Sequence, residues 1–408
     1  MTTLVDEDAF RNEARSFLAA TLLPKGDRSR ATGDAVTRAK AYQRALAAAG
    51  LAGITWPVEY GGRGLPARFQ RIFDQESMRY QLPPQTLAIG LGMAGPTILA
   101  HGTPAQQQTW IPPMLRGEHV WCELFSEPGS GSDLASVQTR AARDGDVWVV
   151  DGQKVWTSGA QYSDFGACLA RTAPERPKRN GITMLVVDMH APGVTVRPLR
   201  QITGESHFNE VFLDGVRVPI GNVIGAVDEG WRVARTMLAF ERQTLGQMGA
   251  GSGDSGRDRR GNIGGLIAEA QARGTTMNAD VRQMLAGLRI RQMLLRHLGA
   301  HLQAEAAAGR ASGGEASILK LAMAQLVQDT AAAGVGIAGA SAIAWDADEP
   351  RAGRWSSRLL DSRSASIGGG TNEIVRNVIA ERVLGLPRDV EVDRDLPFRQ
   401  LKVGTQHD

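Results

Sequence analysis

The hydrophobic pattern of this chain changes twice, and that change restricts the possible folds more than any other feature. Residues 6–50 and 67–115 carry apolar side chains at helical spacing. From about 120 to 226 the pattern becomes the alternation and glycine-rich turns that are typical of β-strands. Helical spacing then returns in four segments, which are 231–250, 279–308, 315–340 and 371–384.

Together these patterns predict an α+β protein built from three parts. The parts are an N-terminal helical domain over 1–119, a middle antiparallel β sandwich or barrel over 120–226, and a C-terminal helical domain over 227–408. Within the middle part, Asp151-Gly152 and Asp214-Gly215 have the composition of hairpin turns.

Composition excludes several classes of function. The net charge is +3 and aromatic residues make up 5%, without the basic stripe and interleaved aromatics of a nucleic-acid-binding protein. Two cysteines, Cys122 and Cys168, give no disulfide framework and no metal-site spacing, so they predict buried thiols in a reducing cytoplasm. The low-charge run 330–345 is shorter than the roughly 20 residues that span a bilayer. The N-terminus lacks signal-peptide features, so we expect a cytoplasmic protein with no membrane or nucleic-acid partner.

Two glycine-rich segments and one histidine pair have ordinary structural explanations. Residues 249–265 are rich in Gly, Ser, Arg and Asp, which predicts a mobile loop. Gly334-Val-Gly-Ile-Ala-Gly339 matches a dinucleotide fingerprint, but the preceding residues 317–333 are strongly helical where that fingerprint needs a strand. A close helix crossing or a helix end explains these glycines better. His297 and His301 lie four apart without a third ligand, so no metal site is predicted.

Two polar blocks in the middle part contain the residues of a ligand site. Phe125-Ser-Glu-Pro-Gly-Ser-Gly-Ser-Asp133 combines hydroxyls with small residues that let backbone N–H groups approach ligand oxygens. Lys154-Val-Trp-Thr-Ser-Gly159 places a large aromatic face beside two hydroxyls. The pair suits a flat polar cofactor and a phosphate-bearing substrate. Each block alone also fits an ordinary turn or core segment.

A third block lies near the end of the chain. In Ile367-Gly-Gly-Gly-Thr-Asn-Glu-Ile-Val-Arg376, three glycines and Thr-Asn precede a helix, which is a suitable anion site at a helix N-terminus. An ordinary helix capped by Thr371 or Asn372 is the alternative.

In this order and with these separations, the three blocks resemble the acyl-CoA dehydrogenase family. The resemblance covers nearly the whole chain and includes Trp56-Pro-Val-Glu-Tyr-Gly-Gly62, Asn209-Glu-Val-Phe-Leu-Asp-Gly-Val-Arg-Val-Pro219 and Phe240-Glu-Arg242. It implies an N-terminal helical domain, a middle β domain and a C-terminal four-helix bundle. FAD would lie between the last two, completed by a neighbouring subunit.

The resemblance also implies roles for individual residues. Those implied to line the FAD are Phe125, Ser126, Gly131, Ser132, Trp156, Thr157, Ser158, Thr371 and Glu373. Those implied to bind the acyl-CoA substrate are Ser132, Arg242 and the backbone N–H of Gly369.

The position of the catalytic base separates this chain from straight-chain members of the family. These enzymes remove a proton from Cα and a hydride from Cβ of an acyl thioester, which gives the 2,3-enoyl-CoA, and pass electrons to an electron-transfer flavoprotein. Straight-chain members have a glutamate before Gly-Thr in the third block, where this chain has Gly369. Glu241 matches the alternative base position of the isovaleryl-CoA dehydrogenase branch. A surface ion pair between Glu241 and Arg242 is the plain alternative.

A missing carboxylate at this position leaves room for branched, cyclic or steroid-derived acyl groups. The chain looks particularly like actinobacterial acyl-CoA dehydrogenases that act on steroid side chains. The Arg-x-x-Phe-Gly segment with which many members bind a neighbour's FAD is absent from residues 271–280. Either the subunit interface differs or a second chain supplies the missing contacts. The resemblance implies a homo-oligomer (dimer or tetramer) or a mixed tetramer with a related chain. Two alternatives stay open: a monooxygenase, nitroalkane oxidase or desulfinase on the same fold, and a non-catalytic partner subunit.

Overall fold

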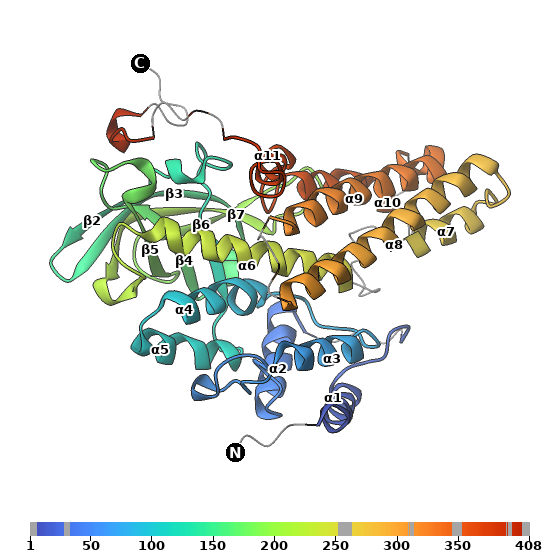
Figure 1. The fold of residues 1–408 in the computed structure, drawn as a ribbon, viewed down its shortest axis with the longest axis horizontal. Coiled ribbons are helices and arrows are strands. Elements are labelled where there is room, and N and C mark those ends of the chain that lie inside the picture. The colour runs from blue at the N-terminus through green and yellow to red at the C-terminus, as the bar shows by residue number, and fades with distance from the viewer. Residues whose placement is uncertain are drawn as a thin grey trace. The chain divides into compact units, whose positions relative to one another are not determined.

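The computed structural model divides the chain into two compact units (Figure 1). The first unit comprises residues 1–201, 206–244 and 391–408, and the second comprises 202–205 and 245–390. The residues that the structure describes are 6–27, 33–251, 263–308, 310, 314–344, 353–388, 390 and 394–401.

Helices form the N-terminal part of the first unit, as their apolar spacing predicts. They are α1 Glu7–Thr21, α2 Ala35–Ala48, α3 Ala67–Ser77, α4 Gly95–His101 and α5 Pro104–Leu115, and a π-helical turn, η2 Gly90–Ala94, precedes α4. The Asp6 carboxylate begins α1 by accepting a hydrogen bond from the Ala9 N–H. Phe10 of α1 packs edge-on against Phe69 of α3, with ring centroids 5.1 Å apart.

Strands of the middle part form one mixed sheet in the order β6-β7-β3-β2-β4-β5-β8, with β1 paired to β4 (Figure 1). The strands are β1 Trp121–Leu124, β2 Arg140–Asp144, β3 Val147–Ser158, β4 Phe165–Arg171, β5 Ile182–Asp188, β6 Val194–Leu199, β7 Phe208–Pro219 and β8 Val223–Ile224. Most neighbours are antiparallel, as expected, and the β1–β4 and β2–β4 pairs are parallel. The α+β class is therefore confirmed, with a sheet of mixed direction.

Neither predicted hairpin turn exists. β3 runs through Asp151-Gly152 and β7 runs through Asp214-Gly215, each as one continuous strand. The two strands pair with each other through both segments instead. Their register shifts between Val150 and Gly152, and the Asp151 side chain accepts a hydrogen bond from the Gly215 N–H at 2.7 Å. An Asp-Gly pair suits a strand bulge as well as a turn, and only pairing with the neighbouring strand decides between them.

Apolar side chains cover both faces of this sheet. Alternation along β5 sends Leu185 and Val187 into one cluster and Met184 and Val186 into the other. The second cluster includes three residues of the helix α6 (Gly230–Gly251), which are Val233, Ala234 and Met237. This contact fixes the first turns of α6 against the sheet.

The second unit is helical, as predicted. Its helices are α7 Ile263–Ala272, α8 Ala279–Ala307, α9 Ala316–Ala338, α10 Arg354–Asp361 and α11 Asn372–Arg382. The predicted loop over 249–265 is wrong at both ends, because α6 continues to Gly251 and α7 begins at Ile263, while 252–262 lie outside the described residues. Across the described ranges, no helix combines the length and apolar character needed to cross a membrane.

The glycine motif of α9 marks a close helix contact, in agreement with its structural interpretation. A Cβ at Gly334 would lie 1.9 Å from Cε3 of Trp355 in α10, whereas one at Gly336 would meet nothing within 4 Å. We expect Gly334→Ala to lower the free energy of unfolding by about 1–3 kcal/mol through overpacking. Gly336→Ala is the matched control and should raise it by up to about 1 kcal/mol through helix propensity. Denaturant unfolding of both variants checks this, and equal effects would contradict it.

Candidate active site

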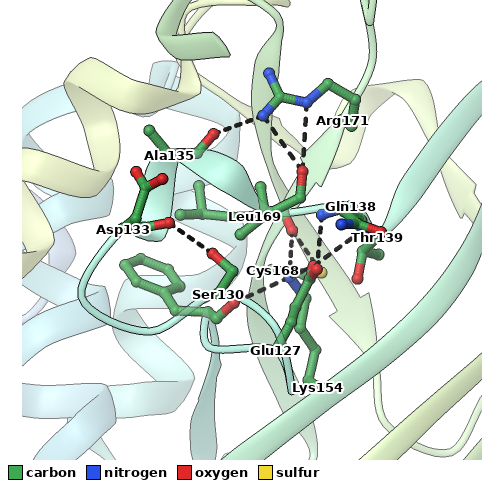
Figure 2. Close-up of polar contacts among 12 residues, drawn as sticks. Glu127, Ser130, Asp133, Ala135, Gln138, Thr139, Lys154, Cys168, Leu169 and Arg171 are labelled. Carbon is green, nitrogen blue, oxygen red and sulfur yellow. Dashed lines mark hydrogen bonds and ion pairs between the residues drawn. The ribbon is translucent and has the colours of Figure 1, made fainter. Parts of the chain in front are cut away.

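One buried carboxylate anchors the loop that follows β1. The Glu127 carboxylate accepts hydrogen bonds from the backbone N–H groups of Gln138 (2.6 Å) and Thr139 (2.9 Å), at the far end of the loop (Figure 2). Glu127 and Ser130 also exchange two backbone hydrogen bonds of 2.9 and 3.0 Å. Hydrogen bonds to Glu127 therefore join the start of this loop to its end at Gln138 and Thr139.

Lys154 of β3 balances this buried charge. Its Nζ donates to Oε1 of Glu127 at 2.7 Å and to the carbonyl oxygens of Phe125 at 3.1 Å and Leu169 at 2.7 Å (Figure 2). All three ammonium donors thus have an acceptor, which is what a fully buried lysine requires. Burial alone would raise the pKa of Glu127, but the Lys154 charge and the hydrogen bonds to the carboxylate hold that pKa below its usual value.

Arg171 of β4 braces the second half of the same loop. Its guanidinium donates to the Ala135 carbonyl at 2.6 Å and lies 3.7 Å from the ring centroid of Phe398. Burial lowers the pKa of Arg171 to about 10. At the loop's outer edge, Asp133 pairs with Lys178 at 3.0 Å.

The tip of the loop stays open. Phe125 is buried in the core and Ser126 is partly buried, whereas Gly131 and Ser132 are exposed. A Cβ at Gly131 would meet nothing within 4 Å. A fixed backbone with small exposed residues lets N–H groups approach a ligand.

Trp156 is turned out of β3 by an irregularity in the strand. The register of β3 against β7 shifts between Lys154 and Thr157, and Trp156 has a φ of 62°, which is rare for a bulky residue. The residue is 58% exposed, and its ring meets Phe208 edge-on at 5.8 Å. Bulges often redirect a side chain next to a binding site, and this one presents an indole beside Thr157 and Ser158.

Two buried polar atoms beside Trp156 lack partners. Oγ1 of Thr157 and Oδ1 of Asn209 are both inaccessible to solvent and have no hydrogen bond within the described part of the chain. The two residues are directly paired across β3 and β7, and Asn209 Nδ2 donates to the Thr157 carbonyl at 3.1 Å. Unsatisfied buried groups are rare in folded proteins and are explained when a ligand supplies the partner.

Glu241 lies on the side of α6 that faces the sheet. Buried Val233, Ala234 and Met237 precede it by eight, seven and four residues, which is the spacing of one helical face. Three residues later, Thr244 donates to the Gly92 carbonyl at 3.0 Å, so the helix is still packed on η2 there. Glu241 and Arg242 are both partly buried.

Sequence reasoning missed Glu123, a second carboxyl group in the same region. It lies on β1 between Cys122 and Leu124, which are fully buried. First burial and then the charge of Glu241 raise the pKa of Glu123 well above its ordinary value. A charged residue inside the apolar strand Trp121-Cys-Glu-Leu124 was the available signal.

The third block lies in the second unit. Thr371 caps α11 by accepting a hydrogen bond from the Ile374 N–H at 3.3 Å, in agreement with the capped-helix interpretation. Gly369 and Gly370 have φ values of 68° and 91°, which glycine adopts without strain. Lys320 of α9 donates to the Gly370 carbonyl at 2.6 Å and so holds this turn. Glu373 is exposed and pairs with Arg376 at 3.3 Å.

The predicted site residues therefore fall into two groups. The first unit contains Phe125, Ser126, Gly131, Ser132, Trp156, Thr157, Ser158, Glu241 and Arg242, and the second contains Gly369, Thr371 and Glu373. His297 and His301 both lie on α8. Within the described ranges, no group of three or more His, Cys, Asp or Glu side chains could hold a metal ion.

Comparison with known protein families gives three matches that follow one another along the chain. Residues 5–118 match the acyl-CoA dehydrogenase N-terminal domain, 122–216 match the middle domain and 228–384 match the C-terminal domain.

Individual relatives agree with these matches. The chain is 42% identical to the acyl-CoA dehydrogenase FadE34 of Mycobacterium tuberculosis over 85% of its own length, but it spans only 46% of that longer protein. It is 36% identical to the acyl-CoA dehydrogenase IpdE1 of the same organism, over 95% of this chain and 99% of IpdE1. Among solved structures, the Tcur3481-Tcur3483 steroid ACAD is 30% identical with a TM-score of 0.78, covering 94% of this chain and 98% of the other.

Proposed function

Because the chain belongs to the acyl-CoA dehydrogenase family, whose members are FAD-dependent oxidoreductases, we propose that it oxidises an acyl-CoA thioester to the 2,3-enoyl-CoA. The observation that carries this proposal is the placement of Glu241 on the sheet-facing side of α6, where its charge helps to raise the pKa of Glu123. Position 369 offers only a glycine, so the proton acceptor has to come from another element.

The residues around Trp156 fit a flavin. Trp156 presents an exposed flat ring, and the Thr157 hydroxyl beside it is buried without a partner in the described chain, as expected for a group that binds a ligand atom. We assign flavin contacts in the first unit to Phe125, Ser126, Gly131, Ser132, Trp156, Thr157 and Ser158, and in the second unit to Thr371 and Glu373. Bound FAD would supply the hydride acceptor that the reaction needs.

Glu241 has the role of general base. It would accept the proton from Cα of the thioester, from the face of α6 that also carries the buried residues Val233, Ala234 and Met237. Arg242 and Ser132 would bind the substrate, and the Gly369 N–H would donate to the thioester oxygen and stabilise the charge that develops there. The network of Glu127 and Lys154 keeps the Ser132 loop in one conformation.

A branched, cyclic or steroid-derived acyl group is the proposed substrate class. A glycine at position 369 leaves the space that a glutamate side chain would fill, and one solved relative is a steroid ACAD. We also propose that the active form is an oligomer, either homomeric or mixed with a related chain, and that an electron-transfer flavoprotein accepts the electrons.

An anaerobic titration of the purified protein tests this function. Straight-chain, 2-methyl-branched, cyclic and steroid side-chain CoA esters are added in turn while flavin absorbance is followed. We expect rapid bleaching with a branched, cyclic or steroid ester and slow bleaching with straight chains, because the space at Gly369 suits bulky groups. If FAD is bound and no ester bleaches it, the dehydrogenase proposal fails in favour of oxygen-dependent chemistry. If FAD is retained only after co-expression with a related chain, the mixed oligomer is supported.

A further inference from the structure

Glu123 has an unusual position for a charged side chain. It lies on β1. Trp121, two residues before it, and Phe125, two residues after it and just beyond the strand, belong to the apolar cluster that includes residues of α6. Strand alternation places Glu123 on the same face as these two aromatic residues. Its direct neighbour on β4 is Ala167, whose neighbour on β5 is Val186, and both are in that cluster. The carboxyl group is therefore directed toward the layer that α6 covers.

The Glu123 carboxyl group lacks the partners that such a position demands. Its Oε1 is inaccessible to solvent and makes no hydrogen bond with any described residue. The residue as a whole is partly buried. An unpaired carboxylate in this environment is costly, and the neutral acid is the form that burial favours.

Few other charges act in this region. Around β1, η2 (Gly90–Ala94) contributes no titratable side chain. Lys154 of β3 is engaged by Glu127 and two carbonyl oxygens. The thiols of Cys122 and Cys168 have pKa values raised to about 12 and about 11 by burial, so both stay neutral. On α6, Arg242 follows Glu241, and Glu241 is the residue whose charge acts on Glu123.

We propose that Glu123 is a positioning residue for the base: it remains protonated beside Glu241, and the two carboxyl groups hold one proton between them. This inference rests on the proposed function, because it takes Glu241 as the base. Because Oε1 of Glu123 has no partner within the described part of the chain, the O–H of the neutral acid is available to the Glu241 carboxylate, where it would stabilise the ionised base and hold it in one orientation. In the reaction, the Cα proton goes to Glu241, and Glu123 keeps its own proton throughout.

The protonation state of Glu123 can be measured without any catalytic step. Above the unfolded-state pKa of about 4.3, the unfolded chain has lost this proton and the folded chain retains it. The folded state binds more protons there, so stability falls as pH rises up to the folded pKa of Glu123. The glutamine in Glu123→Gln cannot ionise, so the stability of this variant does not fall with pH for this reason. Its melting temperature should therefore exceed that of the wild type by a margin that grows by about 1–2 °C per pH unit above pH 5.

Glu59→Gln serves as the control for this comparison. Glu59 is exposed on the surface, so its amide variant should follow the wild type at every pH. A melting-temperature difference between Glu123→Gln and the wild type that stays constant from pH 5 to pH 8 would show that Glu123 is ionised in the folded protein. That result would overturn the proposal.

The pH dependence of the rate of flavin reduction tests the positioning role, through the low-pH side of the profile (the acid limb), where the base becomes protonated. Glu123→Leu removes the donor, so the apparent pKa of the base should rise and the acid limb should move up by about one to two pH units. Glu123→Gln keeps a donor and should leave the limb near the wild-type position, with an unchanged KM. A limb that moves down in Glu123→Gln would mean that an ionised Glu123 repels the base, and a limb that does not move in Glu123→Leu would mean that Glu123 does not act on it. Both outcomes contradict the proposal.

Failure of the proposed function would be recognised separately. If Glu241→Gln reduces its flavin at the wild-type rate, Glu241 is not the base and the positioning role of Glu123 fails with it, whereas the dehydrogenase function fails only if no CoA ester bleaches the flavin. The melting temperatures would still report whether Glu123 is protonated in the folded chain.

Discussion

Replacing Glu241 by glutamine should slow flavin reduction by about 10²–10⁴-fold, or more if no other group accepts the proton. The amide preserves the size and the hydrogen-bonding capacity of the side chain, but it cannot accept the Cα proton. FAD content and the dissociation constant of a substrate analogue should remain close to wild type. Stopped-flow mixing of the enzyme with its best CoA ester under anaerobic conditions measures the rate.

The matched control for this substitution lies on the same segment of chain. Glu229 directly precedes α6, its side chain is 59% exposed and it pairs with Arg232 at 3.5 Å. Glu229→Gln removes the same charge from the helix start and should leave the reduction rate unchanged. A wild-type rate in Glu241→Gln would exclude this residue as the base.

The second large effect is on stability. Lys154→Met should lower the free energy of unfolding by about 3–5 kcal/mol, because it leaves the Glu127 carboxylate buried without its cation. Lys178→Met is the control, since the Lys178–Asp133 pair has an acidic partner that is 57% exposed and should contribute less than about 1 kcal/mol. Denaturant unfolding at pH 7 compares the two variants. Equal losses would show that Lys154 has no special role.

The decrease in the free energy of unfolding caused by Lys154→Met should depend on pH. Because the pKa of Glu127 is lowered in the folded wild type, its contribution to stability is present above the unfolded-state pKa and disappears as pH falls through the folded value. The difference in unfolding free energy between the wild type and Lys154→Met should therefore become smaller at acidic pH. Adding Glu127→Met would restore only part of the stability, since the N–H groups of Gln138 and Thr139 would lose their acceptor.

Sequence patterns predicted the helices and the overall class well, because apolar spacing directly reflects which face of a long helix is buried. They failed at Asp151-Gly152 and Asp214-Gly215, where the choice between a turn and a bulge depends on the neighbouring strand. They also missed the short helix α10, whose position follows from Trp355 packing on Gly334. The three-domain division at 119 and 226 remains a prediction.

The candidate site was predictable where a motif carried it and not elsewhere. The blocks around Ser132 and Trp156 were found from their residues, but the outward turn of Trp156 depends on the register shift in β3. Glu123 belonged to no motif, and its meaning appeared only in the folded chain, where burial and then the charge of Glu241 raise its pKa. The roles of these side chains remain proposals, which the experiments above address.

The contact between Phe398 and Arg171 has a consequence for the order in which the site is completed during synthesis. Phe398 is tied to this region by its N–H bond to the Arg176 carbonyl at 2.8 Å, and the next residue, Arg399, donates to the Pro174 carbonyl at 2.9 Å. Both residues leave the ribosome long after the loop that Arg171 braces. A nascent chain can therefore form the sheet early and still lack the aromatic cover on this arginine. Chains stalled before Phe398 would therefore be the ones most exposed to proteolysis at that loop.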